Sequence, residues 1–142
     1  MGTVTLGDIL VTPLARVTVG GGDVLHAMKC TDTGYAGFGE AYFSSVSMGA
    51  VKAWKLHTQM TMNIVIPVGK VRFAFHLRGT DGFRVEELGA DRYARLTVPP
   101  GIWFGFQGIS APDSMLLNIA NIAHDPAEVQ RAAISEIKFD WS

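Results

Sequence analysis

The segment Gly49–Gly69, GAVKAWKLHTQMTMNIVIPVG, decides the fold of this chain. It contains two strand-like runs, VKAWKLH (51–57) and MNIVIPV (62–68), joined by a short link and bounded by glycine. Side chains two positions apart on a strand lie on the same face of a sheet, so Lys55 and His57 are expected to share one face. The segment therefore predicts two successive strands, one of which carries a lysine and a histidine side by side.

The rest of the chain repeats this pattern of short strand-like runs. Each run is bounded by Gly, Pro, Asp or Ser, and the chain has 16 glycines in all. Short strands at such regular spacing are typical of an antiparallel sandwich or barrel. The predicted strands are 11–19, 24–30, 40–46, 51–57, 62–68, 70–78, 83–89, 92–98, 101–109 and 115–122.

The run KVRFAFHLR (70–78) shows the two-residue period most clearly. One face is expected to carry Val71, Phe73, Phe75 and Leu77, and the other Arg72, Ala74, His76 and Arg78. The sequence GTDG (79–82) that follows is a tight hairpin signal. A two-stranded hairpin is therefore predicted over residues 70–89.

The segment DPAEVQRAAISEI (125–137) is the only convincing helix in the sequence. Asp125 is a natural N-cap, Pro126 suits the first turn, and Glu128 occupies the third helical position of a capping box. We therefore expect an all-β barrel with one short C-terminal helix.

Composition limits the function classes. The chain has 142 residues, of which 48% are hydrophobic and 18% charged, and its net charge is -1. These values predict a single domain over 1–142 and exclude the basic surface of a nucleic-acid binder. Cys30 is the only cysteine, which excludes an internal disulfide and favours a reducing compartment. The sequence contains neither a signal peptide nor an apolar run of about 20 residues, so we expect a cytoplasmic protein without a membrane partner.

The opening segment also has the spacing of a known motif. Gly49, Lys55, His57, Met62 and Gly69 resemble the first motif of metal-binding cupins, and Pro99, Gly101 and Phe104 resemble the second. Lysine, methionine and phenylalanine replace three of the four expected metal ligands. A transition metal needs three or four converging N, O or S donors, so no metal and no other cofactor is expected.

Within the cupins, the chain resembles the dTDP-4-dehydrorhamnose 3,5-epimerase family, as a divergent branch. The family's R-G-L-H is similar to 54–57, its V-x-V-D-L-R to 73–78, and its I-P-P-G-F-A-H-G-F to 98–106. The resemblance covers about residues 23–141. It implies a cupin double-stranded β-helix, a homodimer, and a nucleotide-sugar ligand.

The resemblance also implies an activity. The family removes a proton beside a 4-keto group and returns it, which needs a base, a group that stabilises the enolate, and an acid. Its base falls on His57. Its oxyanion-stabilising lysine falls on Met62, its second histidine on Phe104, and the aspartate of D-L-R on His76. Its tyrosine acid falls near Ala123 or His124, and the aspartate that orients the base falls near Ala133 or Ile134. This implies a nucleotide-sugar epimerase or isomerase of the dTDP-4-keto-6-deoxyhexose class, serving polysaccharide or deoxysugar synthesis.

The changed positions require a rebuilt site. Lys55 would keep its neighbour His57 neutral, as a base requires, and would stabilise an enolate. Candidate substrate contacts are Asn63, Arg72, Arg78, Tyr93, Trp103, Asn118 and His124, with Lys52, Gln107 and Asn121 as further candidates. Arginine and lysine suit a diphosphate, and amide or hydroxyl groups suit a sugar.

Other interpretations remain open from the sequence. Having lost most of the family's catalytic residues, the chain could be a silent cupin that binds a nucleotide sugar or supports a partner enzyme. His57 could be a structural barrel histidine, and Trp54, Trp103, Phe104 and Phe106 could be core residues. A metal-dependent dioxygenase or isomerase is disfavoured by the ligand count.

Overall fold

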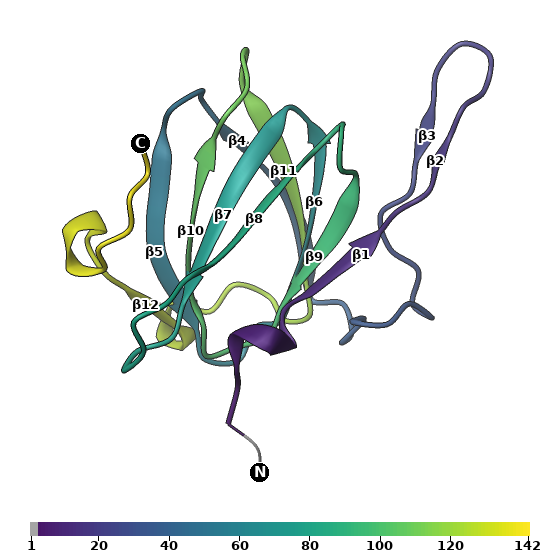
Figure 1. The fold of residues 1–142 in the computed structure, drawn as a ribbon. Coiled ribbons are helices and arrows are strands. Elements are labelled where there is room, and N and C mark those ends of the chain that lie inside the picture. The colour runs from purple at the N-terminus through teal and green to yellow at the C-terminus, as the bar shows by residue number, and fades with distance from the viewer. Residues whose placement is uncertain (1–2) are drawn as a thin grey trace.

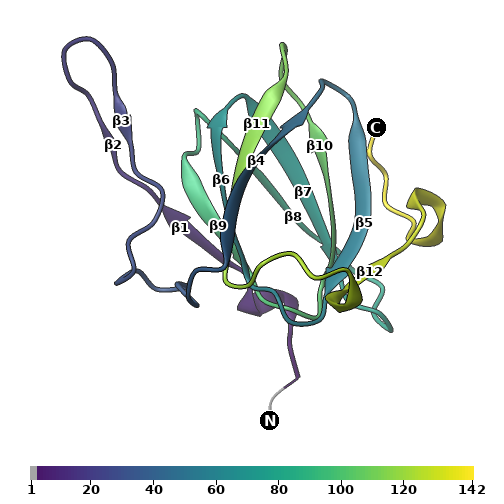
Figure 2. The same ribbon diagram turned by 180° about the vertical axis from the view of Figure 1, so that it is seen from behind.

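Two antiparallel sheets face each other and form a barrel (Figures 1 and 2). The computed structural model describes residues 3–142. The first sheet has the order β1 (Leu10–Pro13), β9 (Ala94–Val98), β6 (Met62–Val68), β11 (Ser114–Ala120) and β4 (Glu40–Val46). The second has the order β12 (Val129–Arg131), β5 (Val51–His57), β10 (Trp103–Gly108), β7 (Lys70–His76) and β8 (Arg84–Gly89). The predicted all-β barrel is confirmed.

A short hairpin projects from the barrel near the N-terminal end. It consists of β2 (Arg16–Val17) and β3 (Val24–Leu25) and follows β1, which is preceded by a 3₁₀ turn, η1 (Leu6–Asp8). Figures 1 and 2 show this hairpin standing away from both sheets. The predicted strand 11–19 is thus divided between the barrel and the hairpin.

The predicted strand 24–30 is shorter than expected. It ends at Leu25, and a loop runs from there to β4. The buried Arg95 side chain binds this loop, donating from Nη1 to the Ala27 carbonyl at 2.8 Å and from Nη2 to the Thr33 carbonyl at 3.2 Å. The Arg95 side chain thus supplies hydrogen bonds that these two carbonyls would otherwise need from a neighbouring strand, and the loop is held without pairing to one.

The barrel core lies between the two sheets. Val71, Phe73 and Phe75 on β7 are fully buried there, and β7 pairs with β8 across the predicted turn. The two-residue period and the hairpin over residues 70–89 are confirmed. This alternation fixes which side chains of each strand can reach the barrel interior.

A second apolar cluster covers the outer face of the second sheet. Trp54, Ala74 and Trp103 are buried there, and Phe139 and Trp141 of the C-terminal segment pack against them. The rings of Trp54 and Trp141 lie 5.6 Å apart between centroids, and those of Phe139 and Trp141 lie 4.6 Å apart. The C-terminal segment is therefore held to the barrel by aromatic packing.

The predicted C-terminal helix is wrong. Residues 125–137 form two 3₁₀ turns, η2 (Pro126–Glu128) and η3 (Ile134–Glu136), with strand β12 between them. Asp125 does cap η2, because its side chain accepts from the backbone N–H of Ala127. The chain then leaves the turn because β12 completes the edge of β5, and the backbones of Trp54 and Ala132 exchange two hydrogen bonds of 3.1 Å. Tertiary pairing thus overrides a good local helix signal.

Among residues 3–142, no helix is long and apolar enough to cross a membrane.

Candidate active site

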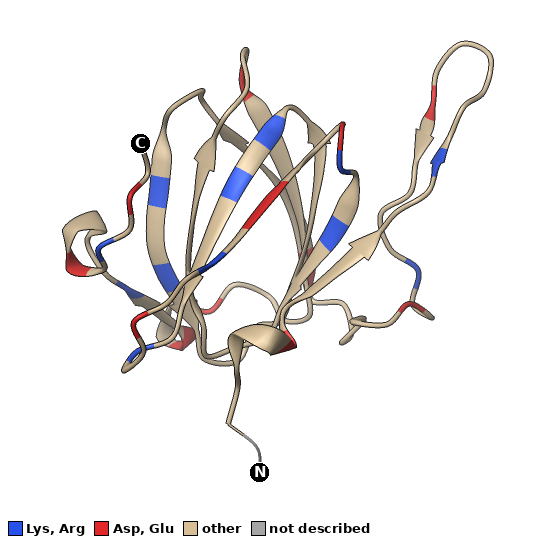
Figure 3. Cartoon of the chain, viewed as in Figure 1, with Lys and Arg blue, Asp and Glu red and all other residues tan. Residues whose placement is uncertain are grey.

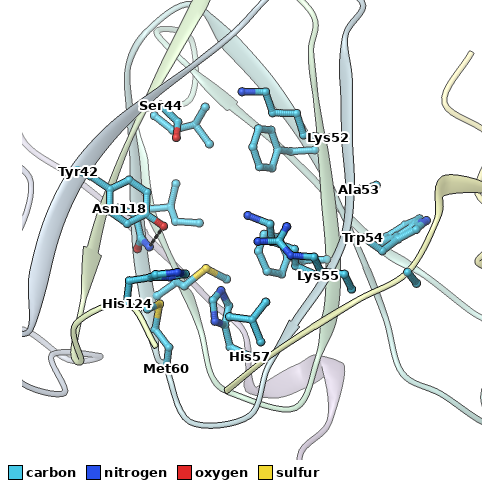
Figure 4. Close-up of a pocket in the computed structure, with 18 residues that line it drawn as sticks. Tyr42, Ser44, Lys52, Ala53, Trp54, Lys55, His57, Met60, Asn118 and His124 are labelled. Atoms are coloured by element: carbon cyan, nitrogen blue, oxygen red, sulfur yellow. Dashed lines mark hydrogen bonds between the residues drawn. The ribbon is translucent and has the colours of Figure 1, made fainter. Parts of the chain in front are cut away.

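A cavity of about 470 Å³ lies between the two sheets, close to β4 of the first sheet and to β5 and β12 of the second. Met60, Met62, Ile64, Phe104, Phe106 and Leu116 form its apolar wall. Its polar lining consists of Tyr42, Ser44, Lys52, Lys55, His57, Asn118, His124 and Arg131. Figure 4 shows Lys52, Lys55 and His57 on one side of this space and Tyr42 and Asn118 on the other. A concave, mostly apolar cavity with a few converging polar groups is typical of a small-molecule site.

A buried histidine–carboxylate pair lies at the wall of the cavity. His57 ends strand β5 and is 7% exposed, and Glu128 ends the turn η2 and is 2% exposed. His57 Nδ1 and Glu128 Oε2 are 2.5 Å apart. The pairing of β12 with β5 places Val129 opposite His57, which brings the preceding Glu128 into contact with the imidazole.

Backbone groups hold the Glu128 carboxylate in place. Its Oε1 atom accepts hydrogen bonds from the backbone N–H of Gln59 at 3.1 Å and of Met60 at 2.9 Å. Burial alone would raise the pKa of Glu128, but the hydrogen bonds from His57, Met60 and Gln59 outweigh burial and lower that pKa. An ionised carboxylate only accepts hydrogen bonds, so His57 Nδ1 carries the proton and Nε2 is left as the basic nitrogen.

Phe104 fixes the other side of the imidazole. Its ring is stacked on His57, with centroids 5.9 Å apart and planes 16° from parallel. The carboxylate at Nδ1 and the phenyl ring on one face together restrict the histidine to one orientation. Such restriction is what a positioned base requires.

The residues of this site do not fit the metal that many cupins bind. Lys55, Met62 and Phe104 occupy the positions of metal ligands and all line the cavity beside His57. A phenyl ring offers no donor atom, and a lysine ammonium repels a cation. Within the described residues 3–142, no group of three or more His, Cys, Asp or Glu side chains could hold a metal ion.

Three basic side chains line the cavity along the edge of the second sheet. Lys52 and Lys55 come from β5 and Arg131 from β12, and Figure 3 shows blue Lys and Arg positions along β5. In residues 3–142, none of the three forms an ion pair with a carboxylate. Burial, followed by the charges of Arg131 and Lys52, lowers the pKa of Lys55. The group is therefore a concentration of uncompensated positive charge that favours an anion.

The facing wall is formed by β4 and β11. Tyr42 and Asn118 are direct partners in the antiparallel ladder, and Asn118 Nδ2 donates to the Tyr42 hydroxyl at 3.0 Å. His124 also lines the cavity, from the loop that follows β11. Of the residues expected from the sequence, the structure thus brings His57, Lys55, Lys52, Asn118 and His124 together.

Two of the expected contacts lie outside the cavity, on the first-sheet side. The Asn63 amide is buried under the loop before β4, where it donates to the Gly34 carbonyl at 3.0 Å and accepts from Thr97 Oγ1 at 2.6 Å. The Tyr93 hydroxyl donates to the His26 carbonyl at 2.7 Å. Both side chains bind the loops that cover the first sheet, and neither lines the cavity.

Three more expected contacts lie on the outer face of the second sheet. Arg72 donates to Glu87 at 2.8 Å and to Gln107 at 3.3 Å. The Trp103 ring is in the outer aromatic cluster, with the Arg78 guanidinium 5.8 Å from its centroid. The alternation of side chains along β7 and β10 directs Arg72 and Trp103 away from the interior that Phe73 and Phe104 occupy, and Arg78 lies in the turn after β7.

The sequence analysis missed three residues of the site: Glu128, Arg131 and Tyr42. The position of the family's orienting aspartate falls near Ala133 or Ile134, which carry no carboxylate and are exposed, and Glu128 contacts His57 instead. Asn121, a further candidate, uses its side-chain oxygen to accept from the Thr61 backbone at 2.8 Å. No strand signal marks this segment, because the run VQR (129–131) does not alternate apolar and polar residues.

Comparison with known proteins gives matches among solved structures only. No family model matches the chain, and the search of curated proteins finds no match. The chain is 30% identical to a dTDP sugar isomerase from Desulfovibrio desulfuricans, with a TM-score of 0.89 over 94% of this chain and 90% of that chain.

Two more distant structures share the fold. A sugar 3,4-ketoisomerase from Thermoanaerobacterium thermosaccharolyticum is 16% identical, with a TM-score of 0.77 over 94% of this chain and 96% of that chain. A dTDP-4-dehydrorhamnose 3,5-epimerase from Sulfolobus tokodaii is 17% identical, with a TM-score of 0.80 over 97% of this chain and 84% of that chain. The predicted cupin fold and the predicted family resemblance are confirmed. At 30% identity over 90% of the Desulfovibrio protein, the chain belongs to the family of cupin dTDP-sugar isomerases and epimerases.

Proposed function

We propose that the protein is a nucleotide-sugar isomerase or epimerase that moves a proton beside the ketone of a dTDP-4-keto-6-deoxyhexose, without a metal. The observation that carries this proposal is the buried His57–Glu128 pair at a cavity lined by uncompensated cations. Relatives of the chain are described as a dTDP sugar isomerase and as a 4-keto-6-deoxy sugar epimerase, which supports the same substrate class.

His57 is the base in this proposal. Its Nε2 atom takes the proton from the carbon beside the ketone, and Glu128 accepts the Nδ1–H and stabilises the imidazolium that forms. A positioned general base contributes about 10²- to 10⁴-fold to such a step. The buried carboxylate has a second function, because it prevents the imidazole from adopting the tautomer that could not accept a proton.

The negative charge that develops on the ketone oxygen needs a partner. Lys55 shares the strand face of His57, two residues away, and supplies a positive charge on that side of the cavity. On the facing wall, Tyr42 accepts a hydrogen bond from Asn118, so its own O–H is available to donate into the cavity. Tyr42 is therefore proposed to donate a hydrogen bond to the ketone oxygen from the wall opposite the base, while Lys55 acts on it through its charge.

The diphosphate of the ligand is assigned to the three cations. Lys52, Lys55 and Arg131 line the cavity beside the base and have no carboxylate partners in residues 3–142. Guanidinium and ammonium groups bind phosphate oxygens by charge-assisted hydrogen bonds. His124 lines the same cavity and is proposed as a contact of the sugar.

Proton exchange tests the proposal directly. The protein is incubated with dTDP-4-keto-6-deoxyglucose in deuterated water, and the sugar C3 and C5 protons are followed by NMR. We expect exchange with the wild-type protein and none above background with His57→Gln, which can still donate to Glu128.

The outcomes separate the enzyme from a silent binding protein. Exchange that survives in His57→Gln would contradict the role of the base. If no exchange occurs at high protein concentration while dTDP binds in the same sample, the protein is a silent cupin that binds a nucleotide sugar.

We further propose that the protein is a homodimer. Phe43 on the edge strand β4 is 63% exposed and lies opposite Leu117, and Val68 is 52% exposed and lies opposite Met115. Exposed apolar side chains of this kind on the first sheet, one of them on its edge strand, favour pairing with a second copy. Light scattering after gel filtration should give a dimer for the wild type and for Val85→Lys, an exposed site on the other sheet, but a monomer for Phe43→Lys. A monomeric wild-type protein would contradict this proposal.

A further inference from the structure

Tyr42 and Asn118 form a polar pair on the wall facing His57. Both line the cavity, and their ladder partnership fixes them side by side on β4 and β11. Asn118 is 5% exposed. In Figure 4 the two side chains meet at the cavity wall, with the hydrogen bond between them drawn as a dashed line.

One atom of this pair has no partner within the protein. The Nδ2 atom of Asn118 donates to Tyr42, but its buried Oδ1 atom accepts no hydrogen bond within residues 3–142. The other buried amide behaves differently, because Asn63 uses both its nitrogen and its oxygen in hydrogen bonds to the protein. A buried acceptor without a donor is destabilising, so its presence on a cavity wall needs an explanation.

The chemistry of the pair defines what fits it. The Tyr42 oxygen accepts from Asn118, which leaves the phenol proton as a donor, and Asn118 Oδ1 remains as an acceptor. A donor and an acceptor on adjacent side chains match a carbonyl oxygen and a hydroxyl group on neighbouring carbons.

We propose that Asn118 is a specificity-determining residue whose Oδ1 atom accepts a hydrogen bond from a sugar hydroxyl on the carbon next to the ketone. The inference rests on the proposed function and narrows it. The substrate class is then an α-hydroxyketone sugar, with the ketone oxygen at Tyr42 and the hydroxyl at Asn118. A site built to bind a hydroxyl rejects the analogue without it, because the buried polar group is then left unpaired.

A binding comparison tests this inference without relying on turnover. The ligands are dTDP-4-keto-6-deoxyglucose, its 3-deoxy analogue and dTDP alone, each titrated by calorimetry into wild-type protein and into the His57→Gln variant, in which no proton transfer is expected. We expect the 3-deoxy analogue to bind about tenfold or more weakly than the parent sugar. This comparison of ligands needs no variant at position 118.

A variant at position 118 then locates the effect. Asn118→Leu, similar in size but without polar atoms, should reduce the discrimination between the two sugars to less than about threefold. Ser44→Ala removes a hydroxyl instead of an amide from the same wall of the cavity. It should retain the wild-type discrimination between the two sugars. Both variants should keep the wild-type affinity for dTDP.

Each remaining outcome overturns the inference. Equal affinities of wild-type protein for the two sugars, or full discrimination in Asn118→Leu, would show that Asn118 does not recognise the hydroxyl. In either case a normal affinity for dTDP and His57-dependent exchange would leave the proposed function intact. If neither sugar nor dTDP binds, the proposed function and this inference fail together.

Discussion

The two faces of strand β5 have opposite chemistry. One face directs Lys52, Lys55 and His57 to the cavity, where the cations have no carboxylate partner within residues 3–142 and the histidine is held by a buried carboxylate. The other directs Trp54 into an aromatic cluster with the C-terminal segment, and Figure 4 shows its ring pointing away from the cavity. The cavity face keeps unsatisfied groups for a ligand, and the outer face stabilises the strand that carries them.

The first way to test this division is to change Glu128 to glutamine. The amide would donate to His57 Nδ1 and favour the tautomer with its proton on Nε2, which cannot act as a base. We expect His57-dependent exchange to fall about 10²- to 10⁴-fold, with unchanged affinity for dTDP. NMR in deuterated water and calorimetry measure the two quantities.

Glu136→Gln is the matched control, because Glu136 is an exposed carboxylate of the same C-terminal segment. It should leave the exchange rate unchanged. An exchange rate for Glu128→Gln within a few-fold of wild type would remove the carboxylate from the mechanism.

The outer face is tested by Trp103→Ala. Trp103 is 3% exposed in the outer cluster, so its truncation should lower the free energy of unfolding by about 3–5 kcal/mol. Denaturant titration measures this loss, and the folded variant should retain dTDP affinity and exchange. Weaker ligand binding without a loss of stability would instead place Trp103 in the binding site and break the division between the faces.

A smaller effect is expected for the cations of the cavity face. Lys55→Gln and Arg131→Gln should each weaken dTDP binding about tenfold, because each removes a charge-assisted contact to phosphate. Arg72→Gln, on the outer face of the same sheet, is the control and should bind as wild type does. Titrations at two salt concentrations should show a weaker salt dependence for the first two variants alone. Equal losses for all three variants would indicate a general charge effect rather than a site.

The smallest expected effect is in the acid stability of the fold. The pKa of Glu128 is lowered in the folded state. At a pH between the folded and unfolded pKa values of this carboxyl, the folded protein therefore binds fewer protons than the unfolded chain. The contribution of Glu128 to the free energy of unfolding is therefore complete above the ordinary carboxyl pKa of about 4.3. It is lost as the pH falls through the pKa of Glu128 in the folded state. Glu128→Gln should remove this contribution from the pH dependence. Unfolding curves of the two proteins between about pH 7 and pH 3 measure the difference, and parallel curves would contradict the prediction.

The sequence was most informative where side-chain alternation decides the structure. It predicted the barrel, the β7–β8 hairpin, and the shared face of Lys55 and His57, because these depend on a local period of two. The same period separates Arg72 from Phe73 and Phe75. Once the phenylalanines are assigned to the core, Arg72 belongs outside, so this residue of the predicted site could have been excluded from the sequence. Arg78 lies in the turn beyond β7, where the period no longer applies.

The rest of the site depends on contacts between distant parts of the chain. Glu128 lies 71 positions from His57, and its local pattern suits a helix cap as well as it suits the turn that precedes a strand. The open edge of β5 decides between the two, and the sequence of residues 125–137 alone does not encode that edge. Tyr42 belongs to no motif, and its role follows only from its ladder partner, Asn118.

The late position of β12 has a consequence for synthesis of the protein. Strands from β1 to β11 contain the cavity walls and the histidine, but the carboxylate at His57 and the guanidinium beside Lys55 follow in residues 125–131. As the chain leaves the ribosome, the residues of the barrel walls therefore emerge before this carboxylate and this guanidinium, which complete the site. A chain interrupted before Glu128 would carry the histidine without its carboxylate, so the site is complete only after β12 has been synthesised.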